Sequence, residues 1–334
     1  MSELRRDSLT GRWVIIAAER AARPQDLLTD IHRTDAANDP FLEGHEDGTP
    51  PEILACRAEG TAPNTPGWRV RVVPNKFPAL KPEGSLTTLA NGVYDALEGV
   101  GAHEVIIECP QFETNMSRLP VDTVRDVLWV YRQRLIDLQR DPRLICPVIF
   151  KNQGAAAGAS LAHSHSQLIV TPIIPPAIQG ELDRALQFHN RQGRCLVCVM
   201  LEQELQSKNR VVLETANFVL CCPFASRFPF ESWIMPKRHA SHYETISPEL
   251  LPELARVLGL ALRNLEWALD DPAFNFVFRS APFGEQGLAY AHWHIEILPR
   301  ITGIAGFELG TGTFINSVAP EDSANILRKS TQRK

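Results

Sequence analysis

The stretch KNQGAAAGASLAHSHSQLIV, residues 151–170, places His163, His165 and Gln167 at strict two-residue spacing behind a run of glycine and alanine. In a β-strand, side chains two residues apart lie on one face, so these three polar groups are expected to project together. An exposed edge strand would also carry polar residues, but it would not explain the preceding segment that almost lacks side chains.

The glycine-rich run suggests a reason for the row. Backbone N–H groups of such a loop can approach an anion closely because no side-chain bulk stands between them. A neutral imidazole can take a nucleotidyl group from one partner and pass it to another, and an amide such as Gln167 can donate to the phosphate oxygen as charge develops there. An HxH pair alone also serves metal sites. Together with the loop and the amide, it predicts attack of a histidine on phosphorus.

Bulk properties narrow the class of protein. The chain has 334 residues, 44% hydrophobic and 22% charged, as is typical of globular domains. A net charge of −5 provides no basic field for nucleic acid or anionic lipid. No run of about 18 apolar residues occurs, so no membrane span is predicted. Seven cysteines and an N-terminus without a secretory h-region predict a cytoplasmic protein without a disulfide framework.

Two parts of the chain repeat one order of features: a helix, an Asp-Pro pair, a strand, a loop and an HxHx(Q/E) row. Pro142 lies 21 residues before His163, and Pro272 lies 20 residues before His292. We interpret this as an internal duplication of an α+β unit; two unrelated helix–strand segments are the other interpretation. Helices are predicted after Pro120 and from Ser247-Pro248, while residues 24–67 are predicted to form an extended surface segment. Strands are predicted at 13–16, 69–74, 104–108, 146–150, 217–220, 232–235 and 274–278.

Residues 152–167 resemble the active-site motif of the galactose-1-phosphate uridylyltransferase family, a branch of the histidine triad (HIT) superfamily. The likeness continues through residues 7–24, 72–80, 101–110 and 305–322. It implies an α+β fold of two HIT-like repeats, with antiparallel sheets packed with helices, usually in a homodimer. The repeats would span residues 1–175, with the nucleophile, and residues 190–325.

The resemblance also implies roles for single residues. His165 would be the nucleophile that becomes uridylylated, and the carbonyl of His163 would hold its other ring N–H. Gln167 and Ser160 would contact the α-phosphate. The remaining candidate substrate-binding residues are Asn75, Phe77 and Asn152 near the nucleotide, Arg20 and Arg23 near its phosphates, Gly158 and Ala159 in the loop, and Glu308 near the sugar.

The implied reaction converts UDP-glucose and galactose 1-phosphate into glucose 1-phosphate and UDP-galactose. It is a ping-pong exchange that needs no catalytic metal. Residues 303–314, however, lack the lysine with which uridylyltransferases contact galactose 1-phosphate, and here they are closer to phosphorylase-like members. The alternative is therefore an ADP- or UDP-sugar phosphorylase that uses the same His165 and passes the nucleotide to phosphate.

Two further functions remain possible on the sequence: a non-catalytic scaffold and a hydrolase. A non-catalytic, zinc-stabilised nucleotide-binding scaffold would keep the pocket without turnover. A hydrolase would use water as the acceptor, but hydrolysing HIT proteins have histidine where this chain has Gln167. Because an amide supplies no general acid or base, the pattern disfavours hydrolysis.

Many family members hold a structural zinc in the first repeat through a CxxC pair, a histidine and the first His of the HxH row. In this chain residues 39–44 contain no cysteine, and Phe112 replaces the histidine, so that only His163 remains. Since zinc affinity depends on the number and type of ligands, we expect no zinc there. His163 would then form hydrogen bonds or pack.

The second repeat carries all four corresponding positions: Cys195, Cys198, His239 and His292. We predict a structural zinc there. The alternatives are a reduced CxxC pair in a core strand, His242 in place of His239, and a redox pair, although no thioredoxin-like unit frames it. Two histidines receive no catalytic role: His294 is expected to be structural because Glu285 would stand at its phosphate site, and His103 is expected to pack or to cap a strand.

Overall fold

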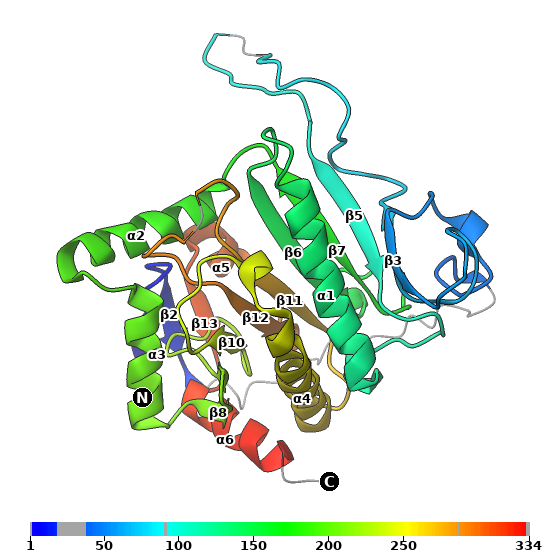
Figure 1. Ribbon diagram of the computed structural model, residues 1–334. Helices are drawn as coiled ribbons and strands as arrows, with labels where there is room; N and C mark the ends of the chain where they lie inside the picture. The colour runs from blue at the N-terminus through cyan, green and yellow to red at the C-terminus, as the bar shows by residue number, and fades with distance from the viewer. Residues whose placement is uncertain (1, 19–37, 90–91, 286, 332–334) are drawn as a thin grey trace.

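The computed structural model describes residues 2–18, 38–89, 92–285 and 287–331. Within these residues, the largest sheet has ten strands, all antiparallel to their neighbours (Figure 1). The strands lie in the spatial order β3 (Leu54–Arg57), β4 (Trp68–Pro74), β5 (Ala102–Ile107), β7 (His165–Thr171), β6 (Cys146–Gln153), β11 (Phe274–Arg279), β12 (His294–Pro299), β10 (Ser232–Pro236), β9 (Phe218–Cys221) and β8 (Val211–Glu214).

The order of the strands repeats outward from the middle of the sheet. β6 pairs with β11 in antiparallel register, with Phe274 opposite Gln153 and Phe278 opposite Ile149. From this pair the order runs β6-β7-β5-β4 on one side and β11-β12-β10-β9 on the other. The predicted α+β class and the repeated order of elements are therefore confirmed, and the two halves share one sheet rather than having two separate ones.

Two long helices cover one face of this sheet (Figure 1). α1 (Val121–Leu138) begins after Pro120, as predicted, and buries Val124, Val127 and Tyr131. α4 (Leu251–Leu269) packs against α1. The predicted start of α4 at Ser247-Pro248 is early, because residues Pro248–Leu250 form a 3₁₀ turn before the helix proper.

The opposite face of β7 is the functional one. Ser166 points toward α1, where its Oγ lies 2.6 Å from the hydroxyl of Tyr131. Since side chains alternate along a strand, His165 and Gln167 project to the face away from α1 and α4. The sequence prediction that these two residues share a face is thus consistent with the register of β7 against β5 and β6.

Several elements were not predicted from the sequence. Within the expected irregular segment 24–67, the structure has the 3₁₀ turn η3 (Glu46–Gly48) and β3, which pairs with β4. α2 (Pro176–Gln192) and α3 (Leu196–Ser207) connect the two halves and pack together. The short turns η4 (Met116–Arg118), η5 (Ala155–Ala157) and η6 (Tyr243–Thr245) complete the connections.

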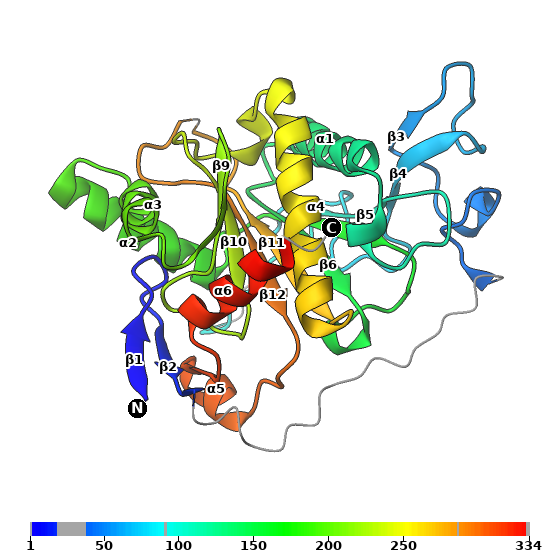
Figure 2. The same ribbon diagram turned by 90° about the horizontal axis from the view of Figure 1, so that it is seen from below.

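A second, three-stranded sheet joins the two ends of the described chain. β1 (Glu3–Arg6) and β2 (Trp13–Ile16) form a hairpin, and β13 (Phe314–Asn316) adds to β2 in parallel. Figure 2 shows α5 (Gly306–Thr311) beside this sheet and α6 (Pro320–Thr331) crossing α4. None of the helices in the described ranges is long and apolar enough to cross a bilayer.

Candidate active site

His165 stands at the first position of β7, where its side chain is almost fully buried. Its Nδ1 lies 2.7 Å from the backbone oxygen of His163. A carbonyl oxygen only accepts hydrogen bonds, so Nδ1 must carry the ring proton. The Nε2 atom is therefore left with its lone pair, which is the form of imidazole that attacks an electrophile.

The surroundings of His165 keep the ring neutral. Burial, followed by the positive charge of Lys151, lowers the pKa of His165 from 6.5 to about 4, although the hydrogen bond to His163 opposes this shift. Both leading causes penalise the protonated ring. At neutral pH nearly every molecule consequently has an unprotonated nucleophile.

We expect the rate of adduct formation at His165 to stay level as the pH falls from about 8 to about 5, because a group with this pKa titrates only near pH 4. The depressed pKa also means that the unfolded chain binds a proton more tightly. The associated stability is present above pH 6.5 and is lost as the pH falls toward 4. Rapid-quench rates across this range, with circular dichroism at each pH as the control for unfolding, test the prediction. An acid limb near pH 6.5 in the folded protein would contradict it.

Gln167 is oriented by a histidine to which the sequence analysis gave no such role. His103 Nδ1 accepts a hydrogen bond from the N–H of Ala79 at 3.0 Å, so its Nε2 carries the proton. That Nε2 donates to Gln167 Oε1 at 2.8 Å, and Asn75 Nδ2 lies 3.4 Å from the same oxygen. With its oxygen held in this way, Gln167 keeps the NH₂ group for another acceptor. His103 therefore does more than the packing or capping that was expected: it orients the side chain of Gln167.

The glycine-rich loop differs from the predicted anion cradle. Gly154 and Gly158 have positive φ values of 82° and 86°, which allow a tight turn. Inside this turn the N–H groups of Ala157 and Ala159 bond to Gly154 O, and that of Gly158 bonds to Ala155 O. These three donors are therefore used within the loop. The side chain of Ser160 is exposed beside them.

Asn152 links this loop to the second half of the molecule. Its Oδ1 accepts a hydrogen bond from Asn275 Nδ2 at 2.8 Å, and the same NH₂ group donates to Ala157 O at 2.8 Å. Asn275 belongs to β11, opposite Asn152 on β6. The loop of residues 154–160 is consequently held by a residue of the other half of the sheet.

A buried ion pair supports the nucleophile from behind. Lys151 Nζ lies 2.7 Å from Glu108 Oε2, and both side chains are almost inaccessible, at 1% and 0% exposure. Lys151 also donates to the backbone oxygen of His165 at 2.9 Å and to Ser164 Oγ at 3.0 Å. The amino group therefore fixes the backbone on which the reactive ring stands. Sequence reasoning treated Lys151 only as the start of the motif and missed this role.

The second repeat gathers four potential metal ligands. The donor atoms of Cys195, Cys198, His239 and His292 all lie within 4.8 Å of one another. Cys198 Sγ is 3.5 Å from His239 Nδ1 and 3.4 Å from His292 Nδ1. Two sulfur and two imidazole donors at these distances are a donor set suited to tetrahedral zinc. The structure thus brings the four predicted residues together.

The alternative positions do not fit the cluster. His242 is buried and engaged elsewhere, with Nδ1 2.7 Å from Ser241 Oγ and Nε2 3.0 Å from the oxygen of Pro282. Cys195 is the residue before α3, not part of a core strand. The arrangement therefore favours His239 over His242.

Comparison with known proteins agrees with the resemblance seen in the sequence. Residues 1–175 match the family model described as galactose-1-phosphate uridyl transferase, N-terminal domain. The ADP-glucose phosphorylase of Arabidopsis thaliana is 35% identical over 98% of this chain and 92% of that protein.

The chain belongs to this family.

Other relatives cover it from end to end. The galactose-1-phosphate uridylyltransferase of Thermotoga maritima is 29% identical over 98% of both chains. The crystal structure of the Arabidopsis thaliana ADP-glucose phosphorylase with bound ADP-glucose superposes with a TM-score of 0.84, covering 98% of this chain and 99% of that one. A uridylyltransferase structure reaches 0.79 at 26% identity, covering 100% of this chain and 99% of that one. As a member of this family, the protein is a nucleotidyltransferase.

The other predicted substrate-binding residues are less closely defined by the structure. Arg20 and Arg23 fall outside the described residues. Phe77 is 84% exposed, and its N–H bonds to Asn75 Oδ1. Glu308 accepts a hydrogen bond from the N–H of Ala305 at 3.1 Å, so one of its oxygens caps α5.

The second HxH row of this uridylyltransferase-family chain is built into the core. His294 Nδ1 lies 3.3 Å from the backbone oxygen of His292, as His165 lies against His163. The ring of His294, however, stacks on Trp233 with centroids 4.7 Å apart. Its neighbour Glu296 is buried in ion pairs with Arg227 and Arg279. These contacts support the structural role expected for His294.

Proposed function

We propose that this protein transfers a nucleotidyl group from a nucleotide sugar by way of a covalent adduct on Nε2 of His165. The observation that carries the proposal is the buried neutral ring whose Nδ1 proton is held by the oxygen of His163. In the first step Nε2 forms a bond to the α-phosphorus, and the bond from that phosphorus to the bridging oxygen breaks. Sugar 1-phosphate leaves with the electron pair of that bond.

In the second step an acceptor phosphate oxygen attacks the same phosphorus, and the P–N bond breaks to restore His165. The NH₂ group of Gln167, held by His103 through its oxygen, would donate to a non-bridging oxygen in both steps. Ser160, Gly158 and Ala159 border the position of the α-phosphate, whereas Asn75, Phe77 and Asn152 border the nucleotide. No step requires a metal. Arg20 and Arg23 would add positive charge near the phosphates, and Glu308 would contact the sugar.

The leading assignment is a UDP-glucose:hexose-1-phosphate uridylyltransferase with galactose 1-phosphate as acceptor. It is supported by the family membership and by the uridylyltransferase relatives. A second candidate is an ADP-glucose phosphorylase with inorganic phosphate as acceptor. Its support is the 35% identity to the Arabidopsis thaliana enzyme and a segment 303–314 without lysine.

One experiment separates the two candidates. The protein is incubated with UDP-glucose or ADP-glucose labelled in the α-phosphate, and the labelled protein is isolated. Each adduct is then mixed with galactose 1-phosphate or with inorganic phosphate. Release as UDP-galactose supports the uridylyltransferase, and release of the label as ADP supports the phosphorylase. If neither nucleotide labels the protein, both assignments fail and the scaffold interpretation stands.

The proposal extends to the repeats, the oligomeric state, the location and the partners of the protein. The nucleophile belongs to a first repeat, residues 1–175, and the metal cluster to a second, residues 190–325. A homodimer is proposed from the family resemblance. A cytoplasmic location is proposed because all seven cysteines are free thiols. Nucleotide sugars and sugar 1-phosphates would be the partners, with no nucleic acid or membrane.

We further propose a structural zinc bound by Cys195, Cys198, His239 and His292. Elemental analysis is expected to find about one zinc per chain, because four ligands form one complete tetrahedral site. Replacement Cys198→Ser should remove the metal and lower Tm by about 5–10 °C, since binding energy at such sites contributes to folding. Cys56→Ser, at a half-buried cysteine outside the cluster, is the control and should retain the zinc. Full zinc content in the Cys198 variant would refute the assignment.

A further inference from the structure

Asp39 is buried against His163. His163 is the one residue of this chain that matches a ligand of the zinc site found in the first repeat of many family members. The carboxylate is 1% exposed, and its Oδ2 lies 2.5 Å from His163 Nδ1. The other ring nitrogen, Nε2, lies 2.9 Å from the backbone oxygen of Cys109. The carboxylate can only accept, so the short contact places a hydrogen bond from Nδ1 of His163 to Asp39. The ring is thus held between a carboxylate and a carbonyl.

The second repeat provides an internal comparison for this arrangement. His292 Nε2 lies 3.0 Å from the oxygen of Pro236, at the end of the neighbouring strand β10. Cys109 likewise follows the end of β5, the neighbour of β7. The two rings differ in what faces Nδ1: the sulfur of Cys198 at 3.4 Å for His292, and a carboxylate for His163.

From this correspondence we infer that Asp39 replaces a metal ion as the anchor of the first HxH row. The inference rests on the proposed role of His165 as the nucleophile. Asp39 acts through His163: the anchored ring fixes the backbone of that residue, and its carbonyl in turn fixes the Nδ1 proton of His165. Asp39 is accordingly a positioning residue and does not touch the reacting atoms.

Asp39 is itself held firmly enough for this role. Burial disfavours its charge, but the hydrogen bonds from His163 and from the N–H of Phe41 outweigh that cost and keep the pKa of Asp39 below its ordinary value. His45 Nδ1 donates to the backbone oxygen of Asp39 at 2.7 Å. The ring of Phe41 meets those of His163 and His165 edge-on, with centroids 6.0 Å and 5.2 Å away.

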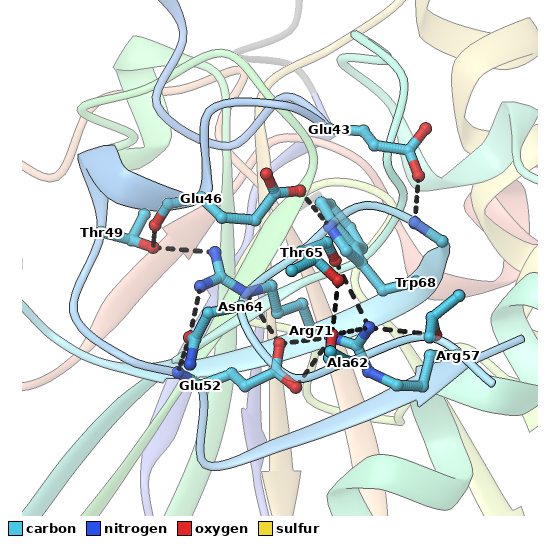
Figure 3. A network of polar contacts seen from close by, with 12 residues as sticks. Glu43, Glu46, Thr49, Glu52, Arg57, Ala62, Asn64, Thr65, Trp68 and Arg71 are labelled. Atoms are coloured by element: carbon cyan, nitrogen blue, oxygen red, sulfur yellow. Dashed lines mark hydrogen bonds and ion pairs between the residues drawn. The ribbon is translucent and has the colours of Figure 1, made fainter. Parts of the chain in front are cut away.

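The segment that carries Asp39 is tied to the sheet by a polar network (Figure 3). Trp68 Nε1 donates to Glu46 Oε1 at 2.8 Å, which fixes the turn after Phe41. Arg71, only 1% exposed, bonds to Thr49, Glu52 and Asn64 from the adjoining stretch. These bonds tie residues 46–64 to β4, so the segment that leads from Asp39 is held against the sheet.

The replacement Asp39→Asn tests the inference, because it removes the charge at nearly constant size and puts an amide against a ring N–H. We expect the rate constant for adduct formation to fall roughly tenfold to a hundredfold, the scale typical of groups that orient a catalytic side chain. Nucleotide-sugar affinity should stay within about threefold, because Asp39 contacts no substrate. The exposed Asp47→Asn, on the same segment, is the matched control and should react like the wild type.

A conservative rescue separates positioning from general destabilisation. In Asp39→Asn/His163→Gln two neutral amides can pair, so the double variant should form the adduct faster than Asp39→Asn alone. Equal rates for wild type and Asp39→Asn, or a loss that affects affinity and rate alike, would overturn the inference. Absence of any adduct in the wild type would instead count against the proposed function.

A spectrum of the wild type adds a readout that does not depend on the rate of adduct formation. In protein with ¹⁵N-labelled histidine, the signals missing from a His163→Gln spectrum identify His163. Nδ1 of His163 should carry the proton that Asp39 accepts, and His165 should carry its proton on Nδ1. An unprotonated Nδ1 on His163 would overturn the inference, since Asp39 would then have no hydrogen bond to accept from that ring.

Discussion

Replacement of His165 by alanine is expected to lower turnover on the order of 10⁴-fold, with nucleotide-sugar binding within a few-fold of the wild type. The ring supplies the only bond to phosphorus in the proposed mechanism, so no neighbouring group compensates for its loss. The structure places the amide of Gln167 next to it, and an amide nitrogen is not a nucleophile. Steady-state kinetics measures the turnover, and calorimetry measures nucleotide-sugar binding.

Intact-mass spectra make this prediction specific. The wild type mixed with its nucleotide sugar should gain the mass of one nucleoside monophosphate, and His165→Ala should gain none. His189→Ala, at a half-buried histidine on α2, is the control and should form the adduct normally. Unchanged turnover in His165→Ala, or an adduct that persists in it, would refute the assignment of the nucleophile.

Replacement of Lys151 by methionine is expected to reduce the free energy of unfolding by about 3–5 kcal/mol, the usual cost of breaking a buried ion pair from one side. Methionine nearly matches the length of lysine, so packing changes little. Glu108, with no exposed surface, would be left with an uncompensated charge. The oxygen of His165 would also lose a donor. Urea unfolding at neutral pH gives the value directly.

The double variant Lys151→Met/Glu108→Gln identifies the cause. If the unpaired carboxylate is responsible, neutralising it should recover more than half of the lost stability. Arg140→Met serves as the control: Arg140 is 73% exposed and pairs with Asp137 at 3.6 Å, so its loss should cost below about 1 kcal/mol. A double variant as unstable as Lys151→Met alone would show that the charge is not the cause.

Local patterns predicted the parts of this molecule that depend on neighbouring residues. The two-residue spacing correctly predicted a common face for His165 and Gln167, and apolar periodicity predicted α1 and α4. His163 was expected in the same row, but it lies in a bend before β7 begins at His165. The duplicated order of elements also carried a long-range prediction. It equated Cys195, Cys198, His239 and His292 with the family ligands, and the structure brings these distant residues together.

The contacts that were missed all depend on strand register or on segments without periodicity. His103 reaches Gln167 only because β5 pairs with β7 so that Val105 lies opposite Gln167. Asp39 lies in a stretch without an apolar pattern. The family resemblance aligned residues 39–44 with ligands of a metal shared with His163, but it did not predict a direct hydrogen bond between Asp39 and that ring. The loop 154–160 was predicted to offer free N–H groups, but short internal hydrogen bonds satisfy three of them, as tight turns commonly do.

The pairing of β6 with β11 makes the two repeats parts of one cooperative unit. A fragment ending near residue 175 would leave the inner edge of β6 without its hydrogen-bonding partner, an open template for aggregation. It would also lose Asn275, which bonds to Asn152 and to Ala157 in the glycine-rich loop. The half of the sheet that has no nucleophile is therefore required for the half that has one.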